Sequence, residues 1–382
     1  MAVDNLLLFP DRLQAIMEDM PGLAVEQLKG DVGARQYFRM SFPTVTRAQR
    51  FIERCSEAAD PGSERFTYHE VQESALVAML LPRKGAARAS RVIADVAEHV
   101  ASCGVPVPAV HLAMHNLGFL VIEDLGDTRL FDVFGEMDAT RLKKTYRELV
   151  DYLIQMQFPP LSVPRDCVAY TYAFSADRFL WELNSFAEPF SEVILKRDLT
   201  PSESEIIRRT FPAICEEMMT QELLFTHRDY HSRNAMIKDD DLYVIDFQDA
   251  RLGPILYDIV SLVFDPYVSL GPKTQQELID YYLSRLPAKS RNALRALGVA
   301  RAFDICLTQR CLKAAGTYAS MANQRDNTDF LRFIPRAFES TIDAARRNGD
   351  LLELSNMLTH WLERTNEFLQ RNQLVHGEPP PG

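Results

Sequence analysis

The sequence predicts an α+β fold of two lobes, with a small, mainly antiparallel β lobe followed by a larger, mainly helical lobe. The chain has 382 residues, which is long enough to build two lobes around one cleft. Strand-like runs occur at residues 26–40 and 74–82, whereas apolar residues recur at helical spacing from Asp138 onward. The expected parts are a first lobe at 1–125, a second lobe at 126–373 and a disordered tail at 374–382.

The small lobe is expected to begin with a helix at residues 11–20, whose apolar residues recur at helical spacing. The strand-like run at 26–40 is interrupted by Gly30 and Gly33. These glycines indicate either a loop that contacts phosphate or a plain hairpin turn. A long polar segment, at about 41–72, is inserted before the next strand.

The rest of the small lobe consists of a strand, a helix and further strands. The strand at 74–82 is followed by a helical pattern at 86–103 that ends at Gly104. The sequence Val-Pro-Val-Pro at 105–108 favours an extended link, because the residue before a proline avoids helical backbone. This link leads into strands that end at Glu123.

The large lobe is expected to be helical along most of its length. Its helices are predicted at residues 138–157, 176–196, 202–219, 256–269, 273–285, 289–319, 330–347 and 350–372. The tail is rich in glycine and proline, so disorder is expected there.

One segment, residues 224–249, carries most of the functional information. Asp229 follows His-Arg, Asn234 lies five residues later, and a short apolar strand at 242–245 leads to Asp246. Phosphoryl transfer needs an acceptor hydroxyl in line, a group that accepts its proton, and metal to neutralise phosphate charge. Asp229 is therefore predicted to be the catalytic base. Asn234 and Asp246 are predicted to bind Mg²⁺, which prefers hard oxygen ligands.

The alternative for each of these residues is structural. An Asp or Asn in a polar turn usually bonds nearby backbone amides, and it is the combined spacing that favours catalysis. His227 is expected to brace the catalytic loop. Asp258 begins an apolar helical run, so we expect it to cap that helix or to brace the loop rather than to bind metal.

The motif resembles the aminoglycoside phosphotransferase and choline kinase family, which has a protein-kinase-like two-lobed fold. His-Arg-Asp-Tyr-His-Ser-Arg-Asn at 227–234 and Asp-Phe-Gln-Asp-Ala at 246–250 carry the resemblance, and no Ala-Pro-Glu signature follows. Within that family the chain is similar to bacterial cell-wall-recycling kinases that phosphorylate the anomeric hydroxyl of N-acetylmuramate and N-acetylglucosamine. The further matching stretches are Gly30-Asp31 with Arg35 to Arg39, Gly118 to Gly126, Gly253 to Leu262, and Gln309 to Lys313.

The resemblance implies ATP and Mg²⁺ as cofactors. It implies nucleotide contacts from the hairpin and from the backbone of the interlobe linker, at Gly30, Asp31, Gly33, Arg35, Arg39, Glu123 and Leu125. The strand at 75–82 lacks the Lys with which protein kinases hold the ATP phosphates. Arg35, Arg39 or Lys84 is expected to supply that charge instead.

An acceptor sugar is expected between the catalytic loop and the helices of the large lobe. The candidate contacts, which are charged side chains suited to hydroxyl or carboxylate groups, are Glu182, Arg233, Asp249, Arg251, Arg310 and Lys313. For Arg310 and Lys313 a solvated helix face is favoured over substrate contact.

The composition excludes several other classes of protein. The net charge of −11 argues against nucleic-acid binding, which needs basic surface. The six Cys form no Cys-x-x-Cys pair, which argues against zinc and a disulfide framework. No signal peptide or membrane span is indicated, so a cytoplasmic protein without membrane, nucleic-acid or obligate protein partners is expected.

The leading hypothesis is an ATP- and Mg²⁺-dependent kinase that phosphorylates the anomeric hydroxyl of an N-acetylated amino sugar. The second is a kinase of another small acceptor, such as an aminoglycoside, a choline-like alcohol or a different sugar. A choline-like acceptor asks for an aromatic cage, for which Phe179, Trp181 and Phe186 are candidates. The third is a catalytically inactive kinase fold that acts as a binding module.

Overall fold

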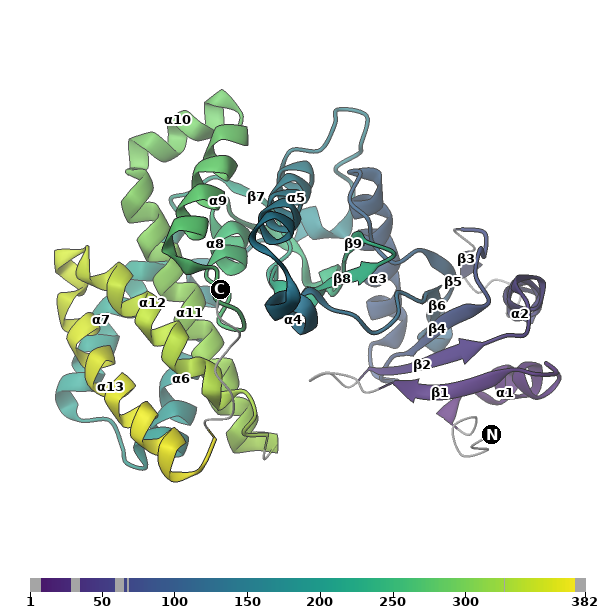
Figure 1. Ribbon diagram of the computed structural model, residues 1–382, viewed down its shortest axis with the longest axis horizontal. Helices are drawn as coiled ribbons and strands as arrows, with labels where there is room; N and C mark the ends of the chain where they lie inside the picture. The colour runs from purple at the N-terminus through teal and green to yellow at the C-terminus, as the bar shows by residue number, and fades with distance from the viewer. Residues whose placement is uncertain (1–7, 29–34, 59–64, 67–68, 326, 375–382) are drawn as a thin grey trace. The chain divides into compact units, whose positions relative to one another are not determined.

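The computed structural model describes residues 8–28, 35–58, 65–66, 69–325 and 327–374. The chain divides into two compact units, each built from segments far apart in sequence (Figure 1). The β unit comprises Met1–Thr128, Ser162–Val168 and Met236–Gln248, and the helical unit comprises Arg129–Leu161, Ala169–Ala235 and Asp249–Gly382. Gly30, Asp31 and Gly33 of the expected phosphate loop, and residues 375–382 of the expected tail, lie outside the described residues.

Six of the described strands of the β unit form one sheet in which every neighbouring pair is antiparallel. In sheet order the strands are β1 (Ala24–Leu28), β2 (Gln36–Ser41), β4 (Ala75–Leu80), β6 (Phe119–Glu123), β5 (Val110–Met114) and β3 (Arg65–Phe66). β4 and β6 are central and apolar, as expected of strands covered on both faces. The predicted antiparallel β lobe is present.

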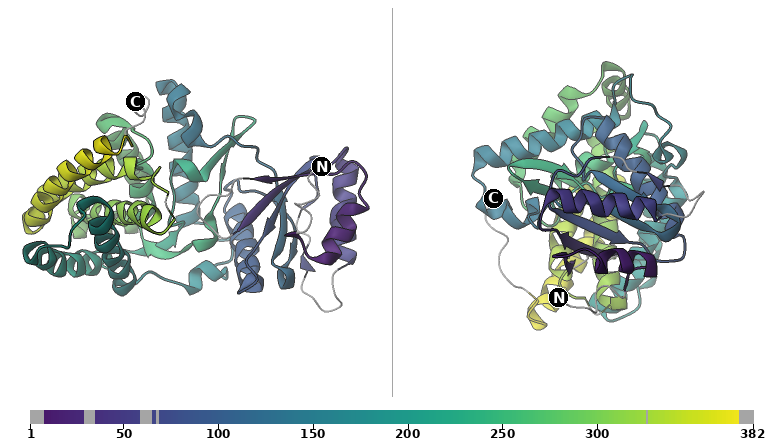
Figure 2. Two further views of the ribbon diagram at one scale, coloured as in Figure 1. Left: turned by 90° about the horizontal axis from the view of Figure 1, so that it is seen from below. Right: turned by 90° about the vertical axis from the view of Figure 1, so that its right-hand side faces the viewer.

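Helices cover the sheet of the β unit. Alternate residues of β4, Leu76 and Ala78, enter a core with apolar side chains of α1 (Asp11–Glu18) and α2 (Val45–Glu57). Figure 2 shows α1 and α2 against one side of the sheet and α3 (Ala86–Ser102) on the other.

The predicted polar insertion contributes to the core of the β unit. Within the described part of residues 41–72, α2 buries Ala48, Phe51, Ile52 and Cys55. Its opposite face is charged, which accounts for the polar appearance of the segment in the sequence.

A hairpin that follows the catalytic loop in sequence is also part of the β unit. β8 (Ala235–Lys238) and β9 (Asp241–Val244) pair around Asp239 and Asp240, whose φ angles are 52° and 68°. Asp and Asn tolerate this left-handed backbone better than most residues do. The backbone N–H of Val244 donates to Pro106 O at 2.8 Å, and that of Ile237 donates to Thr128 O at 2.9 Å.

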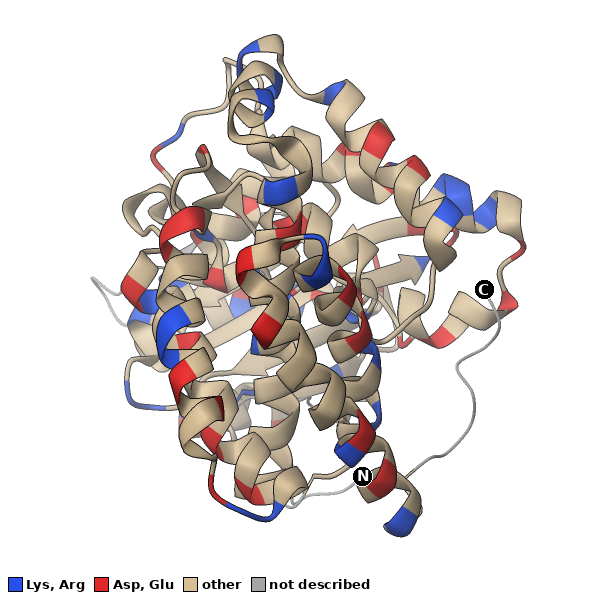
Figure 3. Ribbon diagram, turned by 90° about the vertical axis from the view of Figure 1, so that its left-hand side faces the viewer, with Lys and Arg blue, Asp and Glu red and all other residues tan. Residues whose placement is uncertain are grey.

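The helical unit is built around α11 (Val299–Arg325), which contacts α6, α7, α8 and α12 (Figure 1). The other helices are α4 (Leu130–Val133), α5 (Ala139–Gln157), α6 (Ala176–Phe190), α7 (Pro201–Met218), α8 (Tyr257–Val263), α9 (Gly271–Arg285), α10 (Ala288–Leu297), α12 (Ile334–Arg346) and α13 (Leu352–Arg371). Figure 3 shows acidic and basic residues interspersed over the outer helices of this unit. The predicted mainly helical lobe is present.

Two features of α11 differ from simple helical expectation. The single helix predicted at 289–319 is divided at Gly298, whose φ of 82° ends α10 before α11 begins. Gly316 permits close packing, because a Cβ added there would lie 2.7 Å from Cα of Phe186 on α6.

Candidate active site

The predicted catalytic loop, residues 227–234, follows the buried strand β7 (Leu223–Thr226), which pairs with β10 (Arg251–Pro254). Asp258, in the first turn of α8, accepts hydrogen bonds from the backbone N–H groups of His227 at 2.6 Å and Arg228 at 3.0 Å. Arg228 has a φ of 84°, so these bonds offset an unfavourable backbone conformation. Burial raises the pKa of Asp258 to about 7, although both amides favour its charged form. The predicted bracing role of Asp258 is confirmed.

The other end of the loop is held by Asp265, which sequence reasoning missed. Asp265 accepts hydrogen bonds from the backbone N–H of Ser232 at 2.9 Å and from Ser232 Oγ at 2.5 Å. It also accepts one from the backbone N–H of Tyr267 at 2.8 Å. The available sequence signal was an Asp directly before a proline, which indicates a turn. Two buried carboxylates therefore fix the loop at both ends.

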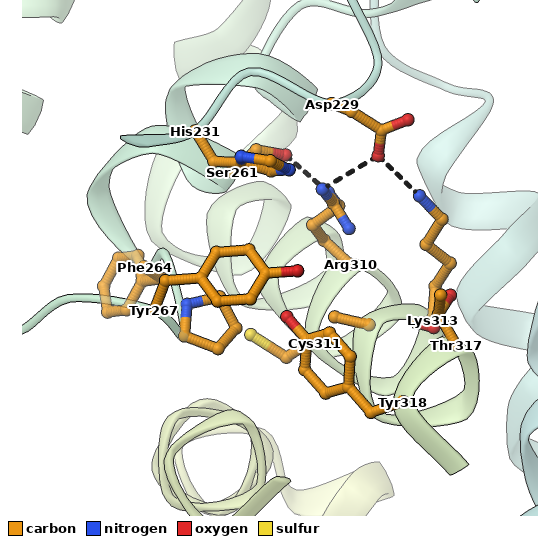
Figure 4. A pocket seen from close by; sticks show the side chains of 12 residues that line it. Asp229, His231, Ser261, Phe264, Tyr267, Arg310, Cys311, Lys313, Thr317 and Tyr318 are labelled. Atoms are coloured by element: carbon orange, nitrogen blue, oxygen red, sulfur yellow. Dashed lines mark hydrogen bonds and ion pairs between the residues drawn. The ribbon is translucent and has the colours of Figure 1, made fainter. Parts of the chain in front are cut away.

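Asp229 lies beside two cations of α11 (Figure 4). Its Oδ1 accepts hydrogen bonds from Lys313 Nζ at 2.8 Å and from Arg310 Nη2 at 3.3 Å. Burial alone would raise the pKa of Asp229, but Lys313, Arg310 and Arg228 outweigh burial and hold it well below its usual range. The Arg310 and Lys313 side chains are only 9% and 13% exposed, so the solvated helix face that the sequence favoured for them is wrong.

A pocket of about 60 Å³ opens beside Asp229. Figure 4 shows the Arg310 and Lys313 side chains directed toward Asp229, with Tyr267 and Tyr318 on the same pocket wall. The remaining lining residues are His231, Ser261, Phe264, Pro266, Cys311, Ala314 and Thr317. Burial, reinforced by the neighbouring cations, lowers the pKa of His231 to about 3, so this imidazole is neutral. The pocket thus combines a carboxylate, two cations and two phenol rings.

The orientation of Asn234 suits a metal ligand. Its Nδ2 donates to the backbone carbonyl of Asp229 at 2.9 Å. The amide oxygen is therefore the group available to accept or to coordinate. Asn234 and Asp229 are joined by this bond within the helical unit.

Arg228 ties together several of the predicted acceptor contacts. Its guanidinium donates to Glu182 Oε1 at 3.4 Å and lies 3.6 Å from Asp249 Oδ2. Glu182 is buried and also accepts from Gln309 Nε2 at 3.3 Å. Arg251 donates to the backbone carbonyl of Asp249 at 3.1 Å. Sequence reasoning assigned no role to Arg228, although its place beside Asp229 in the motif was an available signal.

Arg233 lies in an aromatic cluster. Its guanidinium is 5.7 Å from the ring centroid of Phe131, 5.0 Å from that of Tyr267 and 4.8 Å from that of Phe330. These distances are typical of cation–π contacts. The rings come from three separate segments of the helical unit, so Arg233 links the catalytic loop to all of them.

In the β unit, Arg39 of β2 binds the segment that follows β6. Its guanidinium donates to both oxygens of Asp124, at 2.6 and 3.1 Å, and to both oxygens of Asp127, at 3.0 and 2.9 Å. Leu125 between them is buried. The geometry fixes the linker that was expected to contact adenine, at Glu123 and Leu125, against the sheet.

Lys238 of β8 fixes the same linker from the hairpin. Its Nζ bonds Glu123 Oε1 at 2.9 Å and the backbone carbonyl of Asp124 at 3.0 Å, and it also pairs with Glu73. An isolated Lys at the end of the strand Ala-Met-Ile-Lys gives no sequence signal for this role.

Asp246 follows β9 and has a φ of 64°. Its Oδ1 accepts hydrogen bonds from Gln248 Nε2 at 2.6 Å and from Arg35 Nη1 at 3.2 Å. The Asp246 side chain is 43% exposed, so its carboxylate is open to a ligand. Arg35, directly before β2, belongs to the β unit as well.

Asn234, in the helical unit, and Asp246, in the β unit, each carry the kind of oxygen donor that Mg²⁺ prefers. This ion is commonly held by one or two protein oxygens, with waters and phosphate oxygens completing its shell. Among the described residues, no three or more His, Cys, Asp or Glu side chains gather as a metal cluster. Nor does any described helix have the length and apolar character needed to span a membrane.

Comparison with known sequences places the chain in a family. Residues 57–297 match the model of the phosphotransferase enzyme family. An N-acetylmuramate/N-acetylglucosamine kinase of Neisseria meningitidis is 30% identical over 256 residues, which is 66% of this chain and 75% of that protein. A kinase of the same name from Pseudomonas putida is 29% identical over 265 residues, covering 68% and 74%. The predicted resemblance to these sugar kinases is confirmed.

Solved structures support the fold. The ADP-bound aminoglycoside phosphotransferase APH(2'')-Ib has a TM-score of 0.55 at 12% identity, covering 88% of this chain and 99% of that one. An ethanolamine kinase of Plasmodium vivax has a TM-score of 0.52 at 11% identity, covering 86% and 87%. The predicted kinase-like α+β fold is thereby confirmed. The chain belongs to the phosphotransferase enzyme family, and it is a small-molecule kinase.

Proposed function

We propose that this kinase transfers the terminal phosphoryl group of ATP, in a Mg²⁺-dependent reaction, to the anomeric hydroxyl of N-acetylmuramate or N-acetylglucosamine. The step would serve peptidoglycan recycling in the cytoplasm. Two relatives are named N-acetylmuramate/N-acetylglucosamine kinase, and the matches with this chain cover 75% and 74% of their lengths. The observation that carries the proposal is the ionised Asp229, held by Lys313 and Arg310 at the edge of a small pocket.

Asp229 is the proposed catalytic residue. Its carboxylate would accept a hydrogen bond from the acceptor hydroxyl, orient it in line and take its proton. A carboxylate whose pKa lies well below the usual range is a weak base. Weak basicity suits phosphoryl transfer through a loose transition state, because positioning and charge stabilisation matter more there than early proton removal.

Asn234 and Asp246 are the proposed Mg²⁺ ligands. When bound, Mg²⁺ supplies neutralisation of the charge on the transferring phosphoryl group. The backbones of Glu123 and Leu125 are the proposed adenine contacts. Arg39 and Lys238 support them by fixing the linker.

The acceptor is proposed to be neutral or anionic rather than cationic. The proposed acceptor contacts are Glu182, Asp249, Arg251, Arg310 and Lys313. Three cations act on Asp229, and burial together with repulsion by Arg228 lowers the pKa of Arg251, which indicates crowded positive charge. Positive charge of this kind disfavours an aminoglycoside or a choline-like alcohol. The predicted aromatic cage is not formed, because Phe179 and Phe186 are buried in the core whereas Trp181 is 57% exposed.

The decisive experiment measures ADP release with Mg-ATP across a panel of acceptors. The panel contains N-acetylmuramate, N-acetylglucosamine, their 1-O-methyl glycosides, kanamycin and choline. Turnover of the two free sugars and none of the glycosides is expected, because methylation removes the anomeric hydroxyl. Turnover of kanamycin or choline alone would overturn the substrate assignment.

Variants separate chemistry from binding. Asp229→Ala should abolish turnover and leave nucleotide affinity nearly unchanged, whereas Asp246→Ala should weaken Mg-ATP binding as well. Asp280→Ala is a control, because Asp280 is an exposed helix residue bonded to Gln276. If the wild type shows neither turnover nor thermal stabilisation by Mg-ATP, the alternative of an inactive binding module is favoured.

A further inference from the structure

The β unit lacks the strand Lys with which protein kinases bind the nucleotide phosphates. Protein kinases carry a phosphate-binding Lys on their third strand. The strand expected to correspond to it, β4, reads Ala-Leu-Val-Ala-Met-Leu and contains no cation. A transferring phosphoryl group nevertheless needs fixed positive charge beside it. The other cations of this unit are therefore the candidates for that role.

Two partly buried cations of the β unit, Arg39 and Lys238, are already paired with carboxylates. The Arg39 guanidinium donates four hydrogen bonds to Asp124 and Asp127. Lys238 bonds two glutamates and the Asp124 carbonyl. Moving Arg39 would take this cation away from the buried Asp124 carboxylate, and moving Lys238 would take it away from the half-buried Glu123 carboxylate. Both are therefore structural.

Arg35 is held differently. Its Nη1 contacts Asp246 at 3.2 Å, which is longer than the 2.6 Å contact between Arg39 and Asp124. The Arg35 and Asp246 side chains are 27% and 43% exposed, so water can screen and replace this contact. Asp246 is also the proposed Mg²⁺ ligand. A carboxylate that coordinates the ion attracts a guanidinium less strongly, because the metal neutralises part of its charge.

We propose that Arg35 is the residue that holds the nucleotide phosphates, and that Asp246 neutralises Arg35 until the metal–nucleotide complex arrives. On binding, Asp246 exchanges Arg35 for the metal, and Arg35 exchanges Asp246 for phosphate oxygens. Every charge keeps an opposite partner on both sides of this exchange, so no unpaired charge is created. This inference rests on the proposed function of the site and names the phosphate-binding cation within it.

The exchange predicts opposite responses to one substitution. Without metal, Asp246 both occupies Arg35 and repels phosphate, so Asp246→Asn should tighten binding of metal-free ATP, by about three- to tenfold. With Mg²⁺, the same substitution should weaken ATP binding, because a metal ligand has lost its charge. A role for Asp246 in metal binding alone would leave metal-free affinity unchanged.

The test measures ATP affinity by calorimetry, once with EDTA and once with Mg²⁺. Arg35→Gln should weaken Mg-ATP binding about tenfold or more, and Arg35→Lys should restore part of it. In the double variant Arg35→Gln/Asp246→Asn the metal-free gain should disappear. Arg83→Gln, at an exposed position near the end of β4, is the matched control.

The outcomes separate the two proposals. If the wild type binds Mg-ATP but Arg35→Gln binds it equally well, or if Lys84→Gln shows the loss instead, the assignment of Arg35 is wrong while the proposed function stands. If the wild type binds no nucleotide, the proposed function itself fails. Thermal unfolding of each variant checks that the fold is intact.

Discussion

The contact between α11 and α6 offers a sharp test of how the fold positions the site. In Gly316→Ala, the added Cβ would lie 2.7 Å from Cα and Cβ of Phe186, both of which are close to the helix backbone. To reach the 3.4 Å at which ordinary contact begins, the two helices must separate locally by about 0.7 Å. Neither partner is the flexible end of a side chain, so the backbone has to move.

Two opposing effects set the magnitude. Alanine favours a helix interior over glycine by about 0.5–1 kcal/mol. Overpacking a close-packed core costs about 1–3 kcal/mol. The steric cost wins, and we expect the free energy of unfolding to fall by about 1–2 kcal/mol. Because Lys313 and Arg310 precede Gly316 on the same helix, their contacts with Asp229 should lengthen and kcat should fall.

The assay is urea denaturation together with steady-state kinetics. A fall in the denaturation midpoint at constant slope would report lost stability. Gly349→Ala is the matched control, since no atom lies within 4 Å of a Cβ at that position. If Gly316→Ala is as stable as Gly349→Ala and keeps full kcat, the reasoning that α11 is sterically fixed against α6 is refuted.

Three further substitutions test the loop. Lys313→Met should raise the pKa of Asp229, because one of the cations that depress this pKa is lost. The acid limb of the pH profile of kcat/KM should therefore move to higher pH. An unmoved limb would contradict the assignment of Asp229 as the catalytic base. Asp258→Asn should lower the free energy of unfolding by about 1–3 kcal/mol, since an amide group would face the loop N–H donors, and urea denaturation measures this. Arg233→Ala should lower the free energy of unfolding by about 1–2 kcal/mol and should also lower kcat. Added guanidinium ions should enter the aromatic cluster and restore part of the activity. If they restore none, the cluster is not a cation-binding site.

The catalytic loop was predictable because its chemistry is local in sequence. Asp229 and Asn234 lie five residues apart. Asp258 lies at the start of a predicted helix, where a role in bracing the loop could be inferred. The family could likewise be inferred from a continuous stretch. Motif spacing carries such information because the residues are positioned by a single turn and its neighbouring strands.

What could not be predicted depends on packing between distant segments. Lys313 lies 84 residues from Asp229, and nothing in the periodicity of α11 distinguishes an inward cation from a solvated one. The core role of α2 was hidden by its charged face. Asp265 and Lys238 are single polar residues whose partners are fixed by tertiary contacts alone.

The β8–β9 hairpin has a consequence for how the protein is made. Because Met236–Gln248 belongs to the β unit, that unit is incomplete when a nascent chain has released only residues 1–128 from the ribosome. Pro106 and Thr128 then lack the main-chain partners that Val244 and Ile237 later provide, and Glu73 and Glu123 lack Lys238. Folding of the β unit must therefore wait until more than a hundred further residues have been synthesised. A truncated product that ends at residue 128 should be prone to aggregation.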